Sequence, residues 1–136
     1  MLKVAVAYAS VALTFMVLDA IWLSTMGALL YRPILGPILA ENVRVVPAVI
    51  FYAVFVAGII FFCVLPALES GRWTTALLNG AVFGFLAYAT YDLTNHATLS
   101  VWDTRITLAD MAWGTFVSGV ASVAGYFVTD WMVGRG

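Results

Sequence analysis

The chain has 136 residues, of which 64% are hydrophobic and only 10% are charged, and its mean hydropathy is +1.04. Ordinary soluble domains are less apolar and more charged, so these values exclude a water-soluble globular domain as the main part of the chain. The formal net charge of −1 argues against a basic surface that would bind nucleic acid. We therefore expect the lipid bilayer as the surroundings of this protein and no nucleic-acid partner.

The apolar stretches predict four membrane spans. A spanning helix needs about 20 mainly apolar residues, so four spans occupy most of the chain and leave only short connections. In chain order the predicted spans cover about residues 4–30, 46–68, 73–97 and 106–133. Between the first two lies a predicted loop over residues 31–37, because it contains two prolines and a glycine. The predicted fold class is an all-α membrane protein, a single domain over residues 1–136 that forms an antiparallel bundle of four transmembrane helices.

An even number of spans places both termini on one side of the membrane. Lys and Arg then divide equally between the two sides, with Lys3, Arg72 and Arg135 on the terminal side and Arg32, Arg44 and Arg105 on the other. Cytoplasmic segments normally hold the excess of these residues. The tie is resolved by the amino terminus and by the nearness of the terminal-side residues to the helix ends, which favour cytoplasmic termini.

Small residues recur at four-residue spacing in the last two spans. Gly80 and Gly84 lie on the third span, and Gly114, Ser118 and Ser122 lie on the fourth. Such rows allow helix backbones to approach closely in lipid, where no hydrophobic driving force acts between helices. We therefore expect these two helices to pack tightly.

Four ionisable side chains lie inside the predicted spans: Asp19, Asp92, His96 and Asp110. Each costs at least about 2.5–3.5 kcal/mol on insertion scales and so needs a partner, a water-filled cavity or a function. Asp19 lies roughly 24 Å along the first span and Asp92 roughly 28 Å along the third, at a rise of about 1.5 Å per residue. Because Asp110 lies near the start of the fourth span, all three acids are predicted at one depth, toward the side opposite the termini.

Spacing brings further side chains to these acids. Asp92, Asn95 and His96 are at i, i+3 and i+4 and so share one helix face. Trp22 and Trp113 each follow an aspartate by three residues, in a D-x-x-W pattern that recurs without any alignment around it. The predicted result is a polar, aromatic-walled pocket near one membrane face, under loops that contain Arg32, Arg44 and Arg105. Its predicted ligand-binding residues are Asp19, Trp22, Asp92, Asn95, His96, Asp110 and Trp113.

A purely structural explanation of the same residues stays open. Asp110 would then complement the dipole of its helix, Asp19 would pair with an arginine from a neighbouring loop, and Asn95 and His96 would close the third helix. Asn79, in mid-span, is better explained as a contact between helices than as a site. One histidine without a second histidine or a nearby cysteine falls short of a zinc pattern, so we predict no metal, and the sequence leaves the cofactor unknown.

Three segments resemble one family of small bacterial inner-membrane proteins of unknown function. They are Asp19-Ala20-Ile21-Trp22-Leu23, the run Thr90 to Leu99 with its Y-D-x-T-N-x-A-T pattern, and Asp110-Met111-Ala112-Trp113-Gly114. The resemblance covers essentially the whole chain. It implies a bacterial inner-membrane protein of four helices and a link with membrane-lipid modification, and it implies no activity or cofactor.

The leading hypothesis is a membrane protein that binds a lipid or small molecule in the polar pocket, in connection with lipid modification or transport. One alternative is an enzyme acting on lipid, with Asp92 or His96 as general acid or base. Another is a structural subunit of a larger membrane complex. A proton-coupled transporter would require a homo-oligomer, because four short spans would not enclose a path.

Overall fold

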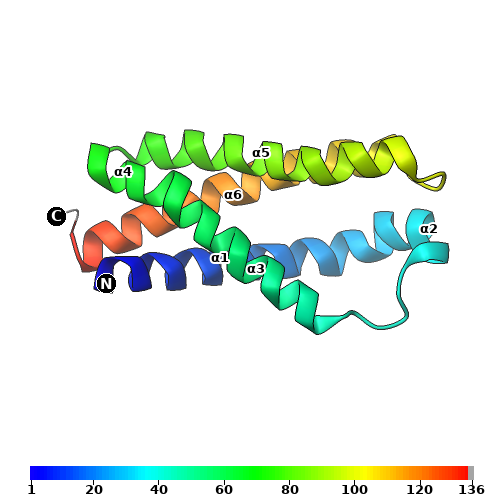
Figure 1. The fold of residues 1–136 in the computed structure, drawn as a ribbon, viewed down its shortest axis with the longest axis horizontal. Coiled ribbons are helices and arrows are strands. Elements are labelled where there is room, and N and C mark those ends of the chain that lie inside the picture. The colour runs from blue at the N-terminus through cyan, green and yellow to red at the C-terminus, as the bar shows by residue number, and fades with distance from the viewer. Residues whose placement is uncertain (135–136) are drawn as a thin grey trace.

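The protein is described here by a computed structural model over residues 1–134, in which the chain forms four long helical rods (Figure 1). The first rod comprises α1 (Leu2–Met26), a π-helical turn (Gly27–Tyr31), α2 (Arg32–Leu35) and a 3-10 turn (Gly36–Ile38). The second comprises α3 (Val45–Ile59), a π-helical turn (Ile60–Val64) and α4 (Leu65–Ser70), and the last two are α5 (Trp73–Thr98) and α6 (Thr104–Met132). The N-terminus and the end of α6 lie at the same end of the bundle, so the predicted all-α antiparallel fold is confirmed.

Three of the rods are long and apolar enough to cross a membrane. They cover Leu2–Ile38, Val45–Ser70 and Thr104–Met132. The remaining rod is α5, which has 26 residues. At a rise of 1.5 Å per residue it is roughly 39 Å long, which exceeds the hydrocarbon thickness of about 30 Å of a bilayer. It packs along α6, and most of the large apolar side chains of the bundle point outward, as lipid contact requires.

The predicted loop over residues 31–37 is wrong, because the chain stays helical as far as Ile38. A proline inside a helix lacks an N–H and crowds the carbonyl four residues earlier. Here a π-helical turn precedes Pro33, and the Arg32 N–H donates to the carbonyl of Gly27, five residues back. The extension also buries apolar surface, because its residues Leu30 and Leu35 form a small core with Trp102 and Ile106.

Pro66 lies after a second π-helical turn, inside the second span. Because it has no N–H, the carbonyl of Phe62 four residues earlier lacks its usual α-helical donor. The side-chain amide of Asn79, from α5, donates a hydrogen bond of 3.0 Å to that carbonyl. The expectation that Asn79 joins helices is therefore confirmed, and its partner is the backbone group that Pro66 leaves without a donor.

The rows of small residues lie where α5 meets α6, as predicted. A Cβ atom on Gly84 would collide with the carbonyl oxygen of Gly114 and with the side chain of Ser118. A Cβ on Gly80 would collide with Ser122 in the same way. Only glycine permits this backbone approach, and α5 and α6 form the most extensive helix contact of the bundle.

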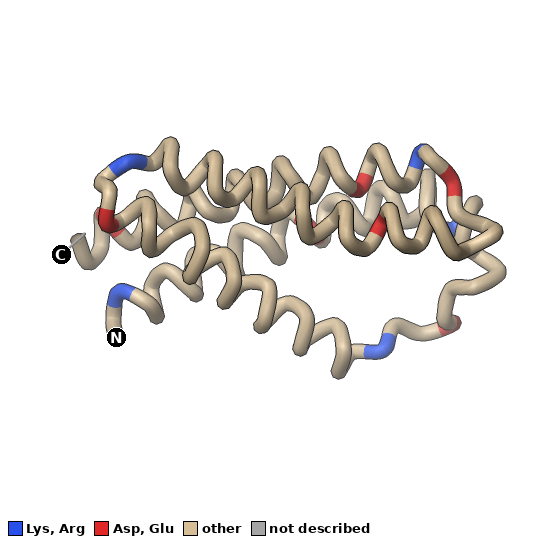
Figure 2. The backbone as a smooth tube through the Cα atoms, turned by 45° about the horizontal axis from the view of Figure 1, so that its top comes forward, with Lys and Arg blue, Asp and Glu red and all other residues tan. Residues whose placement is uncertain are grey.

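Charged residues are distributed unevenly along the bundle. Lys and Arg lie toward its two ends, whereas acidic segments also occur within the long helices, in the half that holds the α5–α6 connection (Figure 2). The main apolar core occupies the other part of the interior, where Val11 and Phe15 of α1 pack against Ile59, Val64 and Val117. The interior therefore has an apolar half near the termini and an acidic half opposite.

Candidate functional site

Asp19, in the fifth turn of α1, is buried and fully hydrogen-bonded. The Trp113 indole N–H of α6 donates to its Oδ1 at 3.2 Å, and the Tyr52 hydroxyl of α3 donates to its Oδ2. Only 8% of the residue is exposed. Its partners are thus aromatic donors from two other helices, in place of the loop arginine of the structural explanation.

Asp110, in the second turn of α6, is held by a similar aromatic relay. The Tyr31 hydroxyl donates to its Oδ1, and the Trp22 indole N–H donates to the Tyr31 hydroxyl oxygen at 2.9 Å. Asp110 is 6% exposed. These hydrogen bonds from aromatic side chains on other parts of the chain hold both carboxyl groups in orientation.

Each of the two D-x-x-W segments, on antiparallel helices, supplies an indole donor for the aspartate of the other segment. Trp113 follows Asp110 but donates to Asp19, and Trp22 follows Asp19 but donates into the relay that ends on Asp110. The two indole rings stack, with centroids 4.6 Å apart and planes 7° from parallel. The repeated D-x-x-W pattern therefore connects α1 and α6 through hydrogen bonds in both directions and through the stacked indoles.

Asp92, on α5, is the most deeply buried of the acids, with no exposed surface, and neither of its carboxylate oxygens has a donor. Its carboxyl group interacts with that of Asp110. Buried polar groups are nearly always paired, and two adjacent carboxylates strongly disfavour ionising together. We therefore expect one proton to be held between Asp92 and Asp110, which would supply the missing donor and remove the repulsion.

A cavity of about 500 Å³ lies beside these acids. Its walls include four residues of the predicted pocket, Asp19, Trp22, Asp110 and Trp113. The remaining lining is mainly aromatic or aliphatic, with one cation, and comprises Leu23, Gly27, Tyr31, Arg32, Leu35, Leu39, Val43, Tyr52, Tyr88, Tyr91 and Trp102. Small-molecule sites have this character: a volume of roughly 300–1,000 Å³, mostly apolar walls and a few placed polar groups.

A second cavity, of about 300 Å³, shares part of the same wall. Tyr88, Tyr91 and Asp110 border both spaces, and Phe51 and Ala87 complete the smaller one. Phe51 is 47% exposed on the outside of the bundle. The smaller cavity is therefore an apolar side chamber between α3 and α5 that leads from the acids toward the surrounding lipid.

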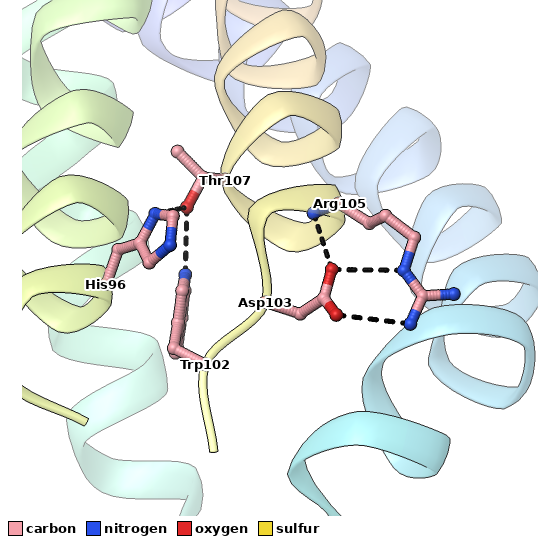
Figure 3. Close-up of polar contacts among 5 residues, drawn as sticks. All are labelled: His96, Trp102, Asp103, Arg105 and Thr107. Carbon is pink, nitrogen blue, oxygen red and sulfur yellow. Dashed lines mark hydrogen bonds and ion pairs between the residues drawn. The ribbon is translucent and has the colours of Figure 1, made fainter. Parts of the chain in front are cut away.

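His96 and Asn95 lie outside the walls of both cavities. The His96 ring is exposed, and its Nδ1 lies 3.1 Å from the Thr107 hydroxyl, which also accepts the Trp102 indole N–H at 2.9 Å (Figure 3). This network fastens the end of α5 to the start of α6. The expected neighbour of His96 was Asp92, and the ring turns instead to Thr107.

The three arginines that were expected in loops above the pocket lie in different surroundings. Arg32 lines the larger cavity, Arg44 precedes α3 on the surface, and Arg105 forms an ion pair of 3.0 Å with Asp103 (Figure 3). Hydrogen bonds from the Arg105 side chain and backbone hold the pKa of Asp103 below its usual value. Asp103 thereby caps the first turn of α6.

Sequence reasoning missed the tyrosines that complete the site. Tyr31, Tyr52, Tyr88 and Tyr91 lie on three different rods, and the contact from Tyr31 to Asp110 spans 79 positions. Only the repeated D-x-x-W offered a signal, since two copies on antiparallel helices can pair head to tail. Within residues 1–134, no group of three His, Cys, Asp or Glu side chains is placed to hold a metal ion.

The fold and the site define a class: a helical-bundle membrane protein with an acidic, aromatic-walled interior cavity. Over residues 4–127 the chain matches the family described as "Predicted membrane protein (DUF2177)", a membrane protein family of unknown function. The match spans most of the chain, so the protein belongs to this family, and the suspected resemblance is confirmed at that level. Comparison with curated proteins and with solved structures gave no match.

Proposed function

We propose that this membrane protein binds a lipid or another small amphiphile in the acid-lined cavity and its side chamber. The observation that supports this most strongly is that the two cavities are adjacent and share Tyr88, Tyr91 and Asp110 in their walls. Buried carboxylates stand at one end, and an apolar chamber reaches the half-exposed Phe51 at the other. A polar head and an apolar tail fit this gradient, and a ligand could enter sideways from the bilayer.

The enzyme alternative has less support from the geometry. General acid–base work by Asp92 and His96 would require both groups to reach one bound substrate. Asp92 is fully buried and lines neither cavity, and the His96 ring is turned to Thr107 outside the cavity walls. Ligand binding needs only the side chains that already line the space.

The proposal includes a place for the protein and for its partners. We propose a bacterial inner membrane with cytoplasmic termini, which places the cavity toward the outer face of that membrane. Assembly into a homo-oligomer or a larger complex, and a role in lipid modification or transport, stay predictions. Mass measurement of the protein in native-membrane discs tests the oligomeric state. The accessibility of single cysteines introduced into the loops tests the orientation.

Filling the side chamber tests binding directly. Ala87→Phe places a ring in the chamber, whereas Ala97→Phe places the same ring on an exposed position of the same helix. Both variants and the wild type are extracted with their surrounding lipid, washed by exchange into detergent, and analysed by mass spectrometry for retained small molecules. We expect a retained ligand in the wild type and Ala97→Phe and its loss in Ala87→Phe. No retained molecule in the wild type, or equal retention in all three proteins, would contradict the proposal.

A further inference from the structure

Acidic side chains outnumber cationic ones in the wall of the larger cavity. Asp19 accepts hydrogen bonds at both oxygens from the uncharged donors Trp113 and Tyr52, and Asp110 accepts one from Tyr31. Both acids line the cavity, whose lining contains one cationic residue, Arg32. Because the hydrogen-bond partners of the two acids are uncharged, a positively charged ligand would complement the wall.

The walls of the cavity suit a positive group. Trp22, Trp113, Tyr31 and Tyr52 gather around the acids, and their ring faces carry negative electrostatic potential. A cation within about 6 Å of such a face is attracted, most strongly when it has lost its water. A buried site of carboxylates and aromatic rings is the usual means of binding an ammonium group, including a quaternary one.

The fully buried Asp92 is a second indication of a functional site beside the cavity. A carboxyl group that has neither exposed surface nor a hydrogen-bond donor lowers the stability of the fold, so its presence calls for a functional reason. Its carboxyl group interacts with that of Asp110, which lines the cavity. Within residues 1–134 no group of three His, Cys, Asp or Glu side chains is placed to hold a metal ion, so the site suits an organic cation better than a divalent metal ion.

We infer that the ligand of this cavity is an amphiphile with one ammonium group, which binds between Asp19 and Asp110 while its apolar chain lies in the chamber lined by Phe51 and Ala87. This inference rests on the proposed function and specifies the head group. Two sources of that chemistry exist, an aminophospholipid such as phosphatidylethanolamine and a single-chain amine. In the first case Arg32, on the same wall, is placed to bind the phosphate.

Three probes of equal chain length separate the head group from the tail. Decyltrimethylammonium, decanol and decanoate are titrated into the protein in nanodiscs of phosphatidylglycerol, with protein-free discs subtracted. The readouts are calorimetry and the tryptophan emission of the protein, to which the stacked pair Trp22 and Trp113 contributes. We expect decyltrimethylammonium to bind at least about tenfold more tightly than decanol, the result of one desolvated cation–π or charge-assisted contact, and decanoate to bind least.

Two variants test whether Asp19 is responsible for the preference for an ammonium head group. Asp19→Asn keeps the size of the side chain and removes one negative charge, so affinity for decyltrimethylammonium should fall by about 10- to 100-fold. Glu69→Gln removes an equal charge from an exposed position at the other end of the bundle and should leave affinity unchanged. The head-group preference of the wild type needs no variant, so it remains decisive if Asp19→Asn fails to fold.

The outcomes separate the two proposals. If all three probes bind equally and saturably, the cavity binds amphiphiles but the ammonium inference is overturned. If no probe binds and no lipid is retained, the proposed function itself fails. Discs that contain phosphatidylethanolamine distinguish the source: retention of that lipid by mass spectrometry, with weaker decyltrimethylammonium binding, indicates the phospholipid, whereas unchanged binding indicates a single-chain amine.

Discussion

Replacing Asp92 by asparagine tests the shared proton. An asparagine amide has nearly the shape of a protonated aspartic acid and donates permanently, so it should take over the hydrogen bond to Asp110. Alanine at the same position removes the donor and leaves the buried Asp110 with the hydrogen bond from Tyr31. Losing a buried hydrogen-bond partner costs about 1–3 kcal/mol, whereas the amide should change the free energy of unfolding by less than about 1 kcal/mol.

The assay is equilibrium unfolding in mixed micelles of dodecylmaltoside and sodium dodecyl sulfate, followed by circular dichroism. Glu69→Gln is the control, since an exposed substitution should lie within about 0.5 kcal/mol of the wild type. Asp92→Asn should also bind decyltrimethylammonium as the wild type does, because the charge of the pair is unchanged. If Asp92→Asn unfolds as easily as Asp92→Ala, the two carboxyl groups do not share a proton.

Three further predictions concern the bundle. Gly84→Ala should destabilise it by about 1–3 kcal/mol in mixed-micelle unfolding, because the new Cβ collides with backbone. Gly36→Ala, which has open space around its Cβ, should not. Asn79→Ala should destabilise the protein by about 1–2 kcal/mol in the same assay. In a Pro66→Ala background, which restores a backbone donor, the cost of Asn79→Ala should largely disappear. Additive effects of the two substitutions would show that Asn79 does not compensate for Pro66. Because its folded pKa is depressed, Asp103 should stabilise the first turn of α6 above about pH 4 and release it as the pH falls through the folded pKa. Lower amide protection factors in that turn on acidification, after correction for the slower intrinsic exchange at acid pH, check the sign.

The sequence predicted the parts of the fold that depend on local composition. Apolar length located the four rods, and the spacing of Gly80, Gly84 and Gly114 located the tight pair α5 and α6. The helical continuation through Pro33 could not be predicted, because two effects outside local propensity decide it. A π-helical turn accommodates the ring, and burial of Leu35 in the small core with Trp102 holds the extension.

The site was only partly predictable for a similar reason. Membrane depth alone was enough to bring Asp19, Asp92 and Asp110 to one end of the bundle. Depth does not fix which way a side chain points, so His96, at the same level, turns to a different partner. The tyrosine donors are set by helix rotation and by pairings between distant positions, such as Tyr52 with Asp19, which no local period encodes.

The most direct test of ligand binding is an experimental structure of the protein extracted with its native membrane lipid and kept out of detergent. The account predicts density from an elongated molecule that is not protein, with its head between Asp19 and Asp110 and its chain beside Ala87. Side chains collapsed into that space, or a cavity that holds only water, would contradict it.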